Sequence, residues 1–156
     1  MCCDWYVSSP TWSPDGNKIA FVTFGSCSDG VPSCYFIYVI DALGGSPRQL
    51  TTTDGADANP RWSPDGKKIA YTHTSGPSDQ TQVYVINADG LTAATQLTKV
   101  HGGTTNPSWS ADGSRLQFTA YKSGLWTMNA NGTGQQQIAG TTASDMRADW
   151  AGCPPF

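Results

Sequence analysis

Few residues in this sequence have the types and spacing that catalysis requires. Histidine occurs only as His73 and His101, which fall on a predicted strand and in a predicted loop. The G-x-S-x-G, H-E-x-x-H, C-x-x-C and Gly-rich phosphate-binding motifs are all absent. We therefore expect a non-catalytic protein without a metal or other cofactor, in which His73 is a structural strand residue.

The five cysteines are the residues best suited to covalent chemistry. Cys27 and Cys34 lie in one Gly-, Ser- and Pro-rich segment and predict a local disulfide that closes a hairpin. Cys2 and Cys3 near one end and Cys153 near the other are candidates for links between subunits. An odd number of cysteines leaves at least one without an intramolecular partner, so terminal cysteines that stay unpaired are the alternative.

One motif suggests a covalent modification. Asn131 begins the sequon Asn-Gly-Thr, which is not blocked by proline and falls at a predicted exposed turn. Asn-Gly is also a preferred hairpin turn sequence, so the same residues are explained without a glycan. Asn131 is therefore a candidate glycosylation site with a structural alternative.

The composition indicates which elements must position these residues. Charged residues make up 13% of the chain, and all twelve acidic residues are Asp. Leu occurs only six times, whereas the chain has 17 Gly, 10 Pro, 18 Thr and 15 Ser. Such a composition is poor in helix formers and rich in turn and strand formers, which predicts an all-β protein and excludes helical bundles.

Charge, hydropathy and cysteine content limit the classes of partner and the cellular location that we expect for the protein. A net charge of -3 and scattered Lys and Arg disfavour nucleic acid and anionic membranes as partners. No run of 18 apolar residues is present, so we expect no membrane insertion. The cysteines and the richness in Thr and Ser favour an extracellular or periplasmic protein, whose export signal we expect outside this sequence.

A repeated segment organises most of the chain. Residues 9–21 recur as 59–71 and again as 106–118, and the tryptophans of the successive copies are 50, 47 and 41 residues apart. Each copy has an Asp-Gly turn between two predicted strands, and a second apolar segment follows, as in 37–42, 83–88 and 125–130. Four antiparallel strands in a repeat of this length form one propeller blade.

The repeat sets the predicted boundaries and the role of its tryptophans. We expect an N-terminal arm at 1–8, a single propeller segment at 9–153 and a tail at 154–156. Within the segment the predicted blades are about 9–55, 56–102 and 103–146, with a stub of a fourth at 147–153. Because Trp12, Trp62, Trp109 and Trp150 share one repeat position, we expect them to pack between blades.

These segments resemble the TolB-type β-propeller repeat, with its P-x-W-S-P-D-G-K-x-I-A-[FY] core. Residues 59–98 fit the pattern almost completely, whereas the first copy has the longer cysteine-bearing hairpin and Leu43-Gly44, and the third has Ala111 in place of Pro. The resemblance implies a propeller that usually closes with about six blades. Similar repeats occur in periplasmic adaptors and in the non-catalytic propellers of oligopeptidases, so the resemblance alone does not fix a function.

The resemblance also implies where a ligand could bind. The loops between blades lead to the mouth of the central channel in such propellers, and polar residues gather there in this sequence. The candidates are Asp57, Asn59, His101, Asn106 and Asp145. Convergent polar groups in a concavity favour a ligand site, but Asp and Asn are equally typical of turns.

Three blades make about half of such a ring, which leaves a blade face open at each end. We therefore expect self-association into a head-to-tail fibre or a closed ring, with Trp5, Trp150 and Cys153 at the interface. Another protein or a glycan is a further candidate partner. The alternatives are a propeller that binds a protein or small ligand, and a fragment of a longer propeller protein or peptidase.

Overall fold

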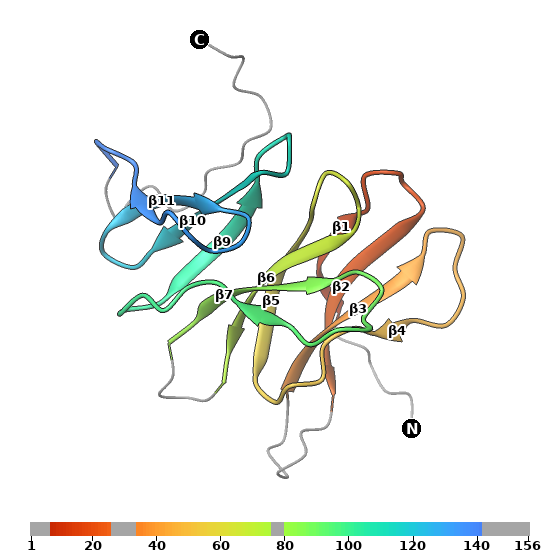
Figure 1. Ribbon diagram of the computed structural model, residues 1–156. Coiled ribbons are helices and arrows are strands. Elements are labelled where there is room, and N and C mark those ends of the chain that lie inside the picture. The colour runs from red at the N-terminus through yellow and green to blue at the C-terminus, as the bar shows by residue number, and fades with distance from the viewer. Residues whose placement is uncertain (1–6, 26–33, 76–79, 142–156) are drawn as a thin grey trace.

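A computed structural model describes residues 7–25, 34–75 and 80–141, and in these ranges the chain is built from β-strands and turns (Figure 1). The strands form three consecutive groups of four. The first blade consists of β1 (Val7–Trp12), β2 (Lys18–Gly25), β3 (Cys34–Asp41) and β4 (Arg48–Gln49). The second consists of β5 (Ala56–Trp62), β6 (Lys68–Thr74), β7 (Gln82–Asn87) and β8 (Thr95–Gln96). The third consists of β9 (Thr104–Trp109), β10 (Arg115–Ala120), β11 (Gly124–Asn129) and β12 (Gln136–Gln137).

Within each blade, strands that are consecutive in the sequence pair antiparallel, as the repeat predicts. A single parallel pair, Tyr35 with Ala56, joins blades 1 and 2 at the crossing between them. The predicted all-β, four-stranded blades are confirmed. β1 already contains Val7 and Ser8, which the sequence places in the N-terminal arm. The predicted fourth stub and residues 1–6 lie outside the described ranges.

The tight turn between the first two strands has the same structure in every blade. In blade 1 the Ser13 hydroxyl donates to Asp15 Oδ1 at 2.5 Å, and the backbone N–H of Asn17 donates to the same oxygen at 3.0 Å. The Asp-Gly step supplies the positive φ that the turn requires, at 71° for Gly16. The Asp of the repeat is therefore a turn residue, as the sequence predicts.

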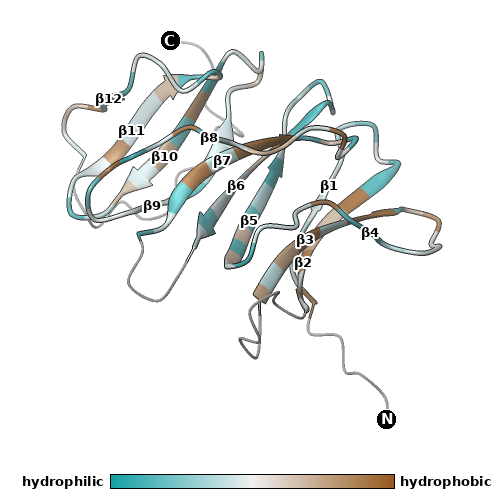
Figure 2. Cartoon of the chain, turned by 60° about the horizontal axis from the view of Figure 1, so that its bottom comes forward, coloured by the Kyte–Doolittle hydropathy of each residue, from teal (hydrophilic) through white to brown (hydrophobic). Residues whose placement is uncertain are grey.

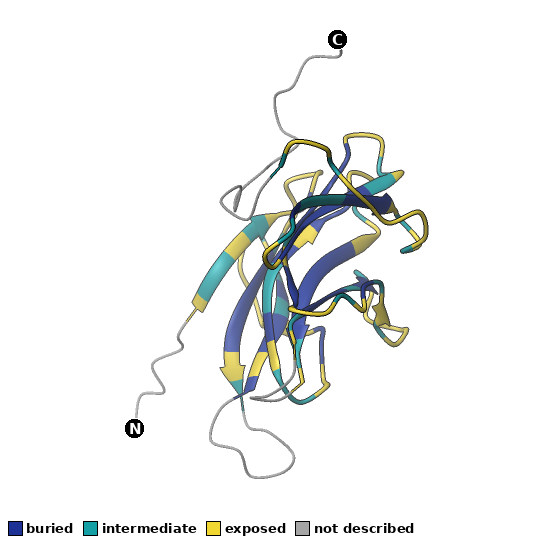
Figure 3. Ribbon diagram, turned by 90° about the vertical axis from the view of Figure 1, so that its left-hand side faces the viewer, coloured by how far each residue is buried: buried dark blue, intermediate teal, exposed yellow. Residues whose placement is uncertain are grey.

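Two apolar cores lie between the blades, one on each face of blade 2. Alternate side chains of β6 enter the two different cores, because successive residues of a strand point to opposite faces of the sheet. Ile69 and Tyr71 pack in the core shared with blade 1, and Ala70 packs in the core shared with blade 3. Figure 2 shows the apolar stretch of β7, and Figure 3 shows that exposed residues gather in the turns. No helix in the described part of the chain is long and apolar enough to cross a membrane.

Candidate functional site

A buried carboxylate and imidazole face each other on two strands of blade 2. Asp57 of β5 and His73 of β6 are register partners, and His73 Nδ1 lies 2.7 Å from Asp57 Oδ1. Only 2% of Asp57 and 4% of His73 is exposed. The sequence predicts that His73 lies on a strand, and the structure confirms this. The sequence does not predict the contact of His73 with Asp57, because nothing local to either residue indicates a partner sixteen positions away.

The electrostatics of this pair are set by burial. Loss of solvent raises the pKa of the Asp57 carboxyl, while hydrogen bonds from His73 and from the Thr51 hydroxyl act in the opposite direction. Asp57 Oδ2 and His73 Nε2 are both buried without a hydrogen-bond partner in the described structure. Each such atom costs about 1 to 3 kcal/mol. The fold therefore carries a polar pair that it does not fully satisfy.

The other two blades show that the propeller fold does not need this pair. The corresponding register partners are Val7 with Thr23 in blade 1 and Thr104 with Ala120 in blade 3. Apolar or neutral residues therefore fill the same positions without a buried ionisable group. Asp57 and His73 are a feature of blade 2 alone, which makes them the strongest candidate for a functional site.

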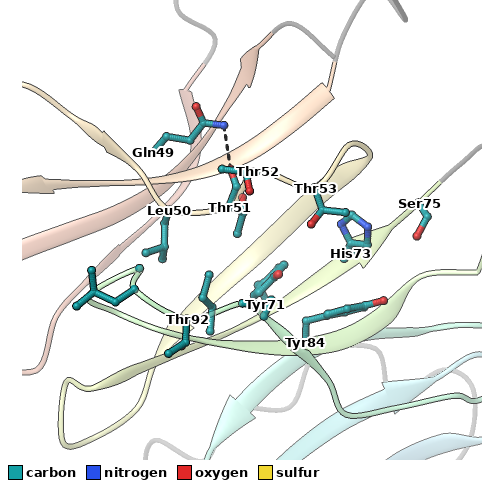
Figure 4. A pocket seen from close by; sticks show the side chains of 15 residues that line it. Gln49, Leu50, Thr51, Thr52, Thr53, Tyr71, His73, Ser75, Tyr84 and Thr92 are labelled. Carbon is teal, nitrogen blue, oxygen red and sulfur yellow. Dashed lines mark hydrogen bonds between the residues drawn. The ribbon is translucent and has the colours of Figure 1, made fainter. Parts of the chain in front are cut away.

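The pair lies beneath a surface depression that we call the His73 groove. It consists of two adjoining cavities of about 420 Å³ and about 470 Å³, and His73, Ser75 and Tyr84 line both. The first cavity runs toward blade 1 and the β7–β8 turn and is lined by the side chains shown in Figure 4. The second runs toward the β8–β9 loop and is also lined by Gln80, Gln82, Gln96, Lys99, Val100 and His101.

Aromatic rings shape the middle of the groove. Tyr84 of β7 contacts His73 edge-on, with ring centroids 5.2 Å apart, and contacts Tyr71 with centroids 5.9 Å apart. Figure 4 shows the three rings side by side between the two blades. Burial raises the pKa of the Tyr71 and Tyr84 hydroxyls, so both remain neutral donors and acceptors near neutral pH.

The structure separates the residues predicted to line a channel mouth. Asp57 is buried and His101 is exposed on the groove. Asn59 and Asn106 instead adopt left-handed φ angles of 53° and 52° at the points where the β5 and β9 registers shift. Asn tolerates this conformation, so both side chains are explained by a β-bulge. Asp145 lies outside the described residues.

The repeated tryptophans link successive blades. Trp62 Nε1 donates to the Thr11 carbonyl at 3.2 Å, and Trp109 Nε1 donates to the Arg61 carbonyl at 3.1 Å. Trp62 and Trp109 are 9% and 7% exposed, whereas Trp12 is 61% exposed. The predicted packing between blades is confirmed for the two buried residues. Trp12 differs because the described structure contains no blade before the first one.

The remaining predicted residues stay predictions. Cys34 is buried at the start of β3, but Cys27 lies outside the described residues, so the predicted disulfide is not tested. The predicted interface residues also lie outside: Cys2, Cys3, Trp5, Trp150 and Cys153. Asn131 is exposed in the β11–β12 turn, where its Oδ1 accepts a hydrogen bond from the Thr133 hydroxyl at 2.7 Å. This contact explains the residue as a turn former and leaves glycosylation open.

These features define a segment of a β-propeller made of stacked four-stranded blades. The chain belongs to the PD40 family, the TolB beta propeller domain, whose profile matches residues 3–152. No curated protein matches the chain.

Solved structures with the same fold include TolB from Acinetobacter baumannii, with a TM-score of 0.61 and 20% identity over 91% of this chain and 45% of that one. The β-propeller domain of the Trilobed protease from Pyrococcus furiosus has a TM-score of 0.65 and 17% identity over 88% of this chain and 44% of that one. The chain thus spans less than half the length of either structure.

Proposed function

We propose that the chain is a non-catalytic assembly module in which the first blade docks a blade of a second copy. The observation that carries this proposal is the exposure of Trp12, at 61%, against 9% and 7% for its repeat equivalents. Trp62 and Trp109 each bury the indole against the preceding blade. A further blade placed before β1 would offer Trp12 the same environment.

Other residues of blade 1 support the position of this surface. Ile19 and Ile40 are register partners that are half-buried, whereas their equivalents Ile69 and Ile86 in blade 2 are 0% and 5% exposed. Phe21 is buried on the same face and stacks on Tyr38. The open region therefore centres on Trp12, Ile19 and Ile40, at the end of the blade that carries the Asp-Gly turn.

The repeat itself favours a copy of this chain as the occupant. The described part of the molecule already contains two blade-to-blade interfaces of one design, with the same Trp-to-carbonyl hydrogen bond. In stacked repeats one face of a blade fits the opposite face of the next blade. A head-to-tail contact between copies therefore gives a ring or a fibre. The five cysteines support covalent links between copies and an extracellular or periplasmic location.

The mass of the particle in solution tests this proposal. We expect light scattering to give a multiple of the 16.6 kDa chain mass, with and without reductant. Trp12→Ser should weaken association by about 2 kcal/mol, or roughly thirtyfold, because a central aromatic contact is lost. Leu91→Ser is the control, since Leu91 is 85% exposed in a turn of blade 2, whose two faces are already covered by its neighbours.

Three outcomes contradict the proposal. The first is a single-chain mass at about 100 µM, because a stable interface would hold the copies together at that concentration. Equal losses from Trp12→Ser and Leu91→Ser would place the contact elsewhere. If a longer chain with further repeats stays monomeric and protects Trp12, the missing blade comes from the same chain.

A further inference from the structure

The His73 groove has the properties of a ligand site, and its chemistry can be read from its lining. Three basic side chains, His73, Lys99 and His101, line its second cavity together with the neutral phenol of Tyr84. No carboxylate lines either cavity in the described part of the chain. This basic end is local, since the whole chain has a net charge of -3. It therefore attracts a negatively charged group.

The loop that carries the basic side chains is held in place by glutamines of blade 2. Gln82 accepts a hydrogen bond from the Val100 N–H at 3.1 Å and donates to its carbonyl at 2.9 Å. Gln80 accepts from the Gly102 N–H at 2.6 Å. The backbone on both sides of His101 is thus fixed, so the loop places Lys99 and His101 at the edge of the cavity before a ligand arrives.

The other end of the groove offers neutral polar groups beside aromatic rings. Thr51, Thr52, Thr53 and Thr92 line the first cavity, and Gln49 lies next to them. Tyr84 presents an aromatic ring between the two ends (Figure 4). Hydroxyls, amides and a ring face suit a hydroxylated carbon chain, which has both donors and C–H groups.

The buried pair supplies a reason for a ligand to bind at this blade. His73 is 4% exposed and its Nε2 has no partner, although the ring lines both cavities. Tyr84 is half-buried and Ser75 is exposed, and both line the two cavities beside the His73 ring. A ligand hydroxyl between them would supply the missing hydrogen bond.

We propose that the His73 groove binds a small hydroxylated carboxylate. Its carboxylate lies at Lys99 and His101, and its hydroxylated body lies over Tyr84 toward the threonines. This site is independent of Trp12 and of any association between chains.

Three small probes separate the parts of this proposal. Gluconate carries both the carboxylate and the hydroxyls, glucose carries hydroxyls alone, and acetate carries the carboxylate alone. The chain has only two histidines, so the His73 and His101 imidazole signals can be followed by NMR. We expect gluconate to shift both signals saturably, with glucose and acetate binding at least about tenfold more weakly.

Matched lysine variants locate the carboxylate. Lys99→Gln should lower the gluconate affinity about fivefold, because a charge-assisted contact is lost. Lys67→Gln, on an exposed turn outside the groove lining, should leave the affinity unchanged. No shift of either histidine at about 10 mM gluconate, or equal effects of the two variants, overturns the proposal.

Discussion

The repeated aspartates show how a single residue type can have a dominant structural role. Asp15 and Asp112 accept hydrogen bonds from the serine hydroxyl two residues before them and from the backbone N–H two residues after them. These hydrogen bonds hold the pKa of each carboxyl at about 2, below its ordinary value of 3.8. The folded state therefore binds a proton less readily than the unfolded state does.

The pH dependence of stability follows from this difference. A lowered pKa in the folded state stabilises the fold above pH 3.8, and that contribution is lost as the pH falls toward 2. We expect the double variant Asp15→Asn with Asp112→Asn to lose less stability than the parent between about pH 5 and pH 2. Urea midpoints at the two pH values measure this. Asp41→Asn is the control, and a double variant with the parent's full acid sensitivity would contradict the assignment.

The turn aspartates and the buried Asp57 differ in how far the sequence predicts their environment. Asp15 and Asp112 are predictable as turn residues because their partners lie within two positions in the chain. Asp57 has the same residue type, but its environment depends on β5–β6 register and on Thr51 from the preceding blade. Those contacts become visible only when two strands and two blades are placed together.

At the scale of elements, the crossing from blade 1 to blade 2 depends on Gly55. Its carbonyl accepts a hydrogen bond from the Tyr35 N–H at 2.9 Å, just before the parallel contact of β3 with β5. Gly55 has a φ of 141°, and a Cβ there would collide with the Thr74 carbonyl oxygen and with His73 Cε1. The close approach therefore needs a residue without a side chain.

Substitution of this glycine tests the crossing. Gly55→Ala should reduce the free energy of unfolding by about 2 to 4 kcal/mol, because both the φ angle and the space oppose a methyl group. Gly44→Ala is the control, since Gly44 has a φ of 97° but no neighbour within 4 Å of the added carbon. It should cost about 1 kcal/mol. Equal effects in a chemical unfolding experiment would show that the collision is relieved.

The elements also show which parts of the fold were predictable. The strand order and turns follow from the repeat, since each copy has the same apolar segments and the same Asp-Gly turn. The bulges at Asn59 and Asn106 do not, because Asn before Pro fits both a turn and a ligand-binding loop, and the sequence leaves both alternatives open. The left-handed φ of Ser9 at the same position in blade 1 shows that the bulge belongs to the repeat.

For the whole molecule, the stack of blades predicts a gradient of stability. Both faces of blade 2 are covered, and Ile69, Ala70 and Tyr71 of β6 are 0%, 0% and 3% exposed. No residue of β1 is buried, and only β2 pairs with it in the described structure. In stacked repeats the local stability depends on neighbouring interfaces, so a covered blade opens less often than a terminal strand.

Hydrogen exchange measures this gradient and its response to assembly. At low concentration the β6 amides should exchange most slowly and those of β1 much faster. At a concentration where the proposed assembly forms, protection should rise in β1 and stay nearly constant in β6, because docking at Trp12 covers the first blade. The variant Trp12→Ser should abolish the change in β1. If β1 exchanges equally fast at both concentrations while the particle mass rises, the copies associate through another surface.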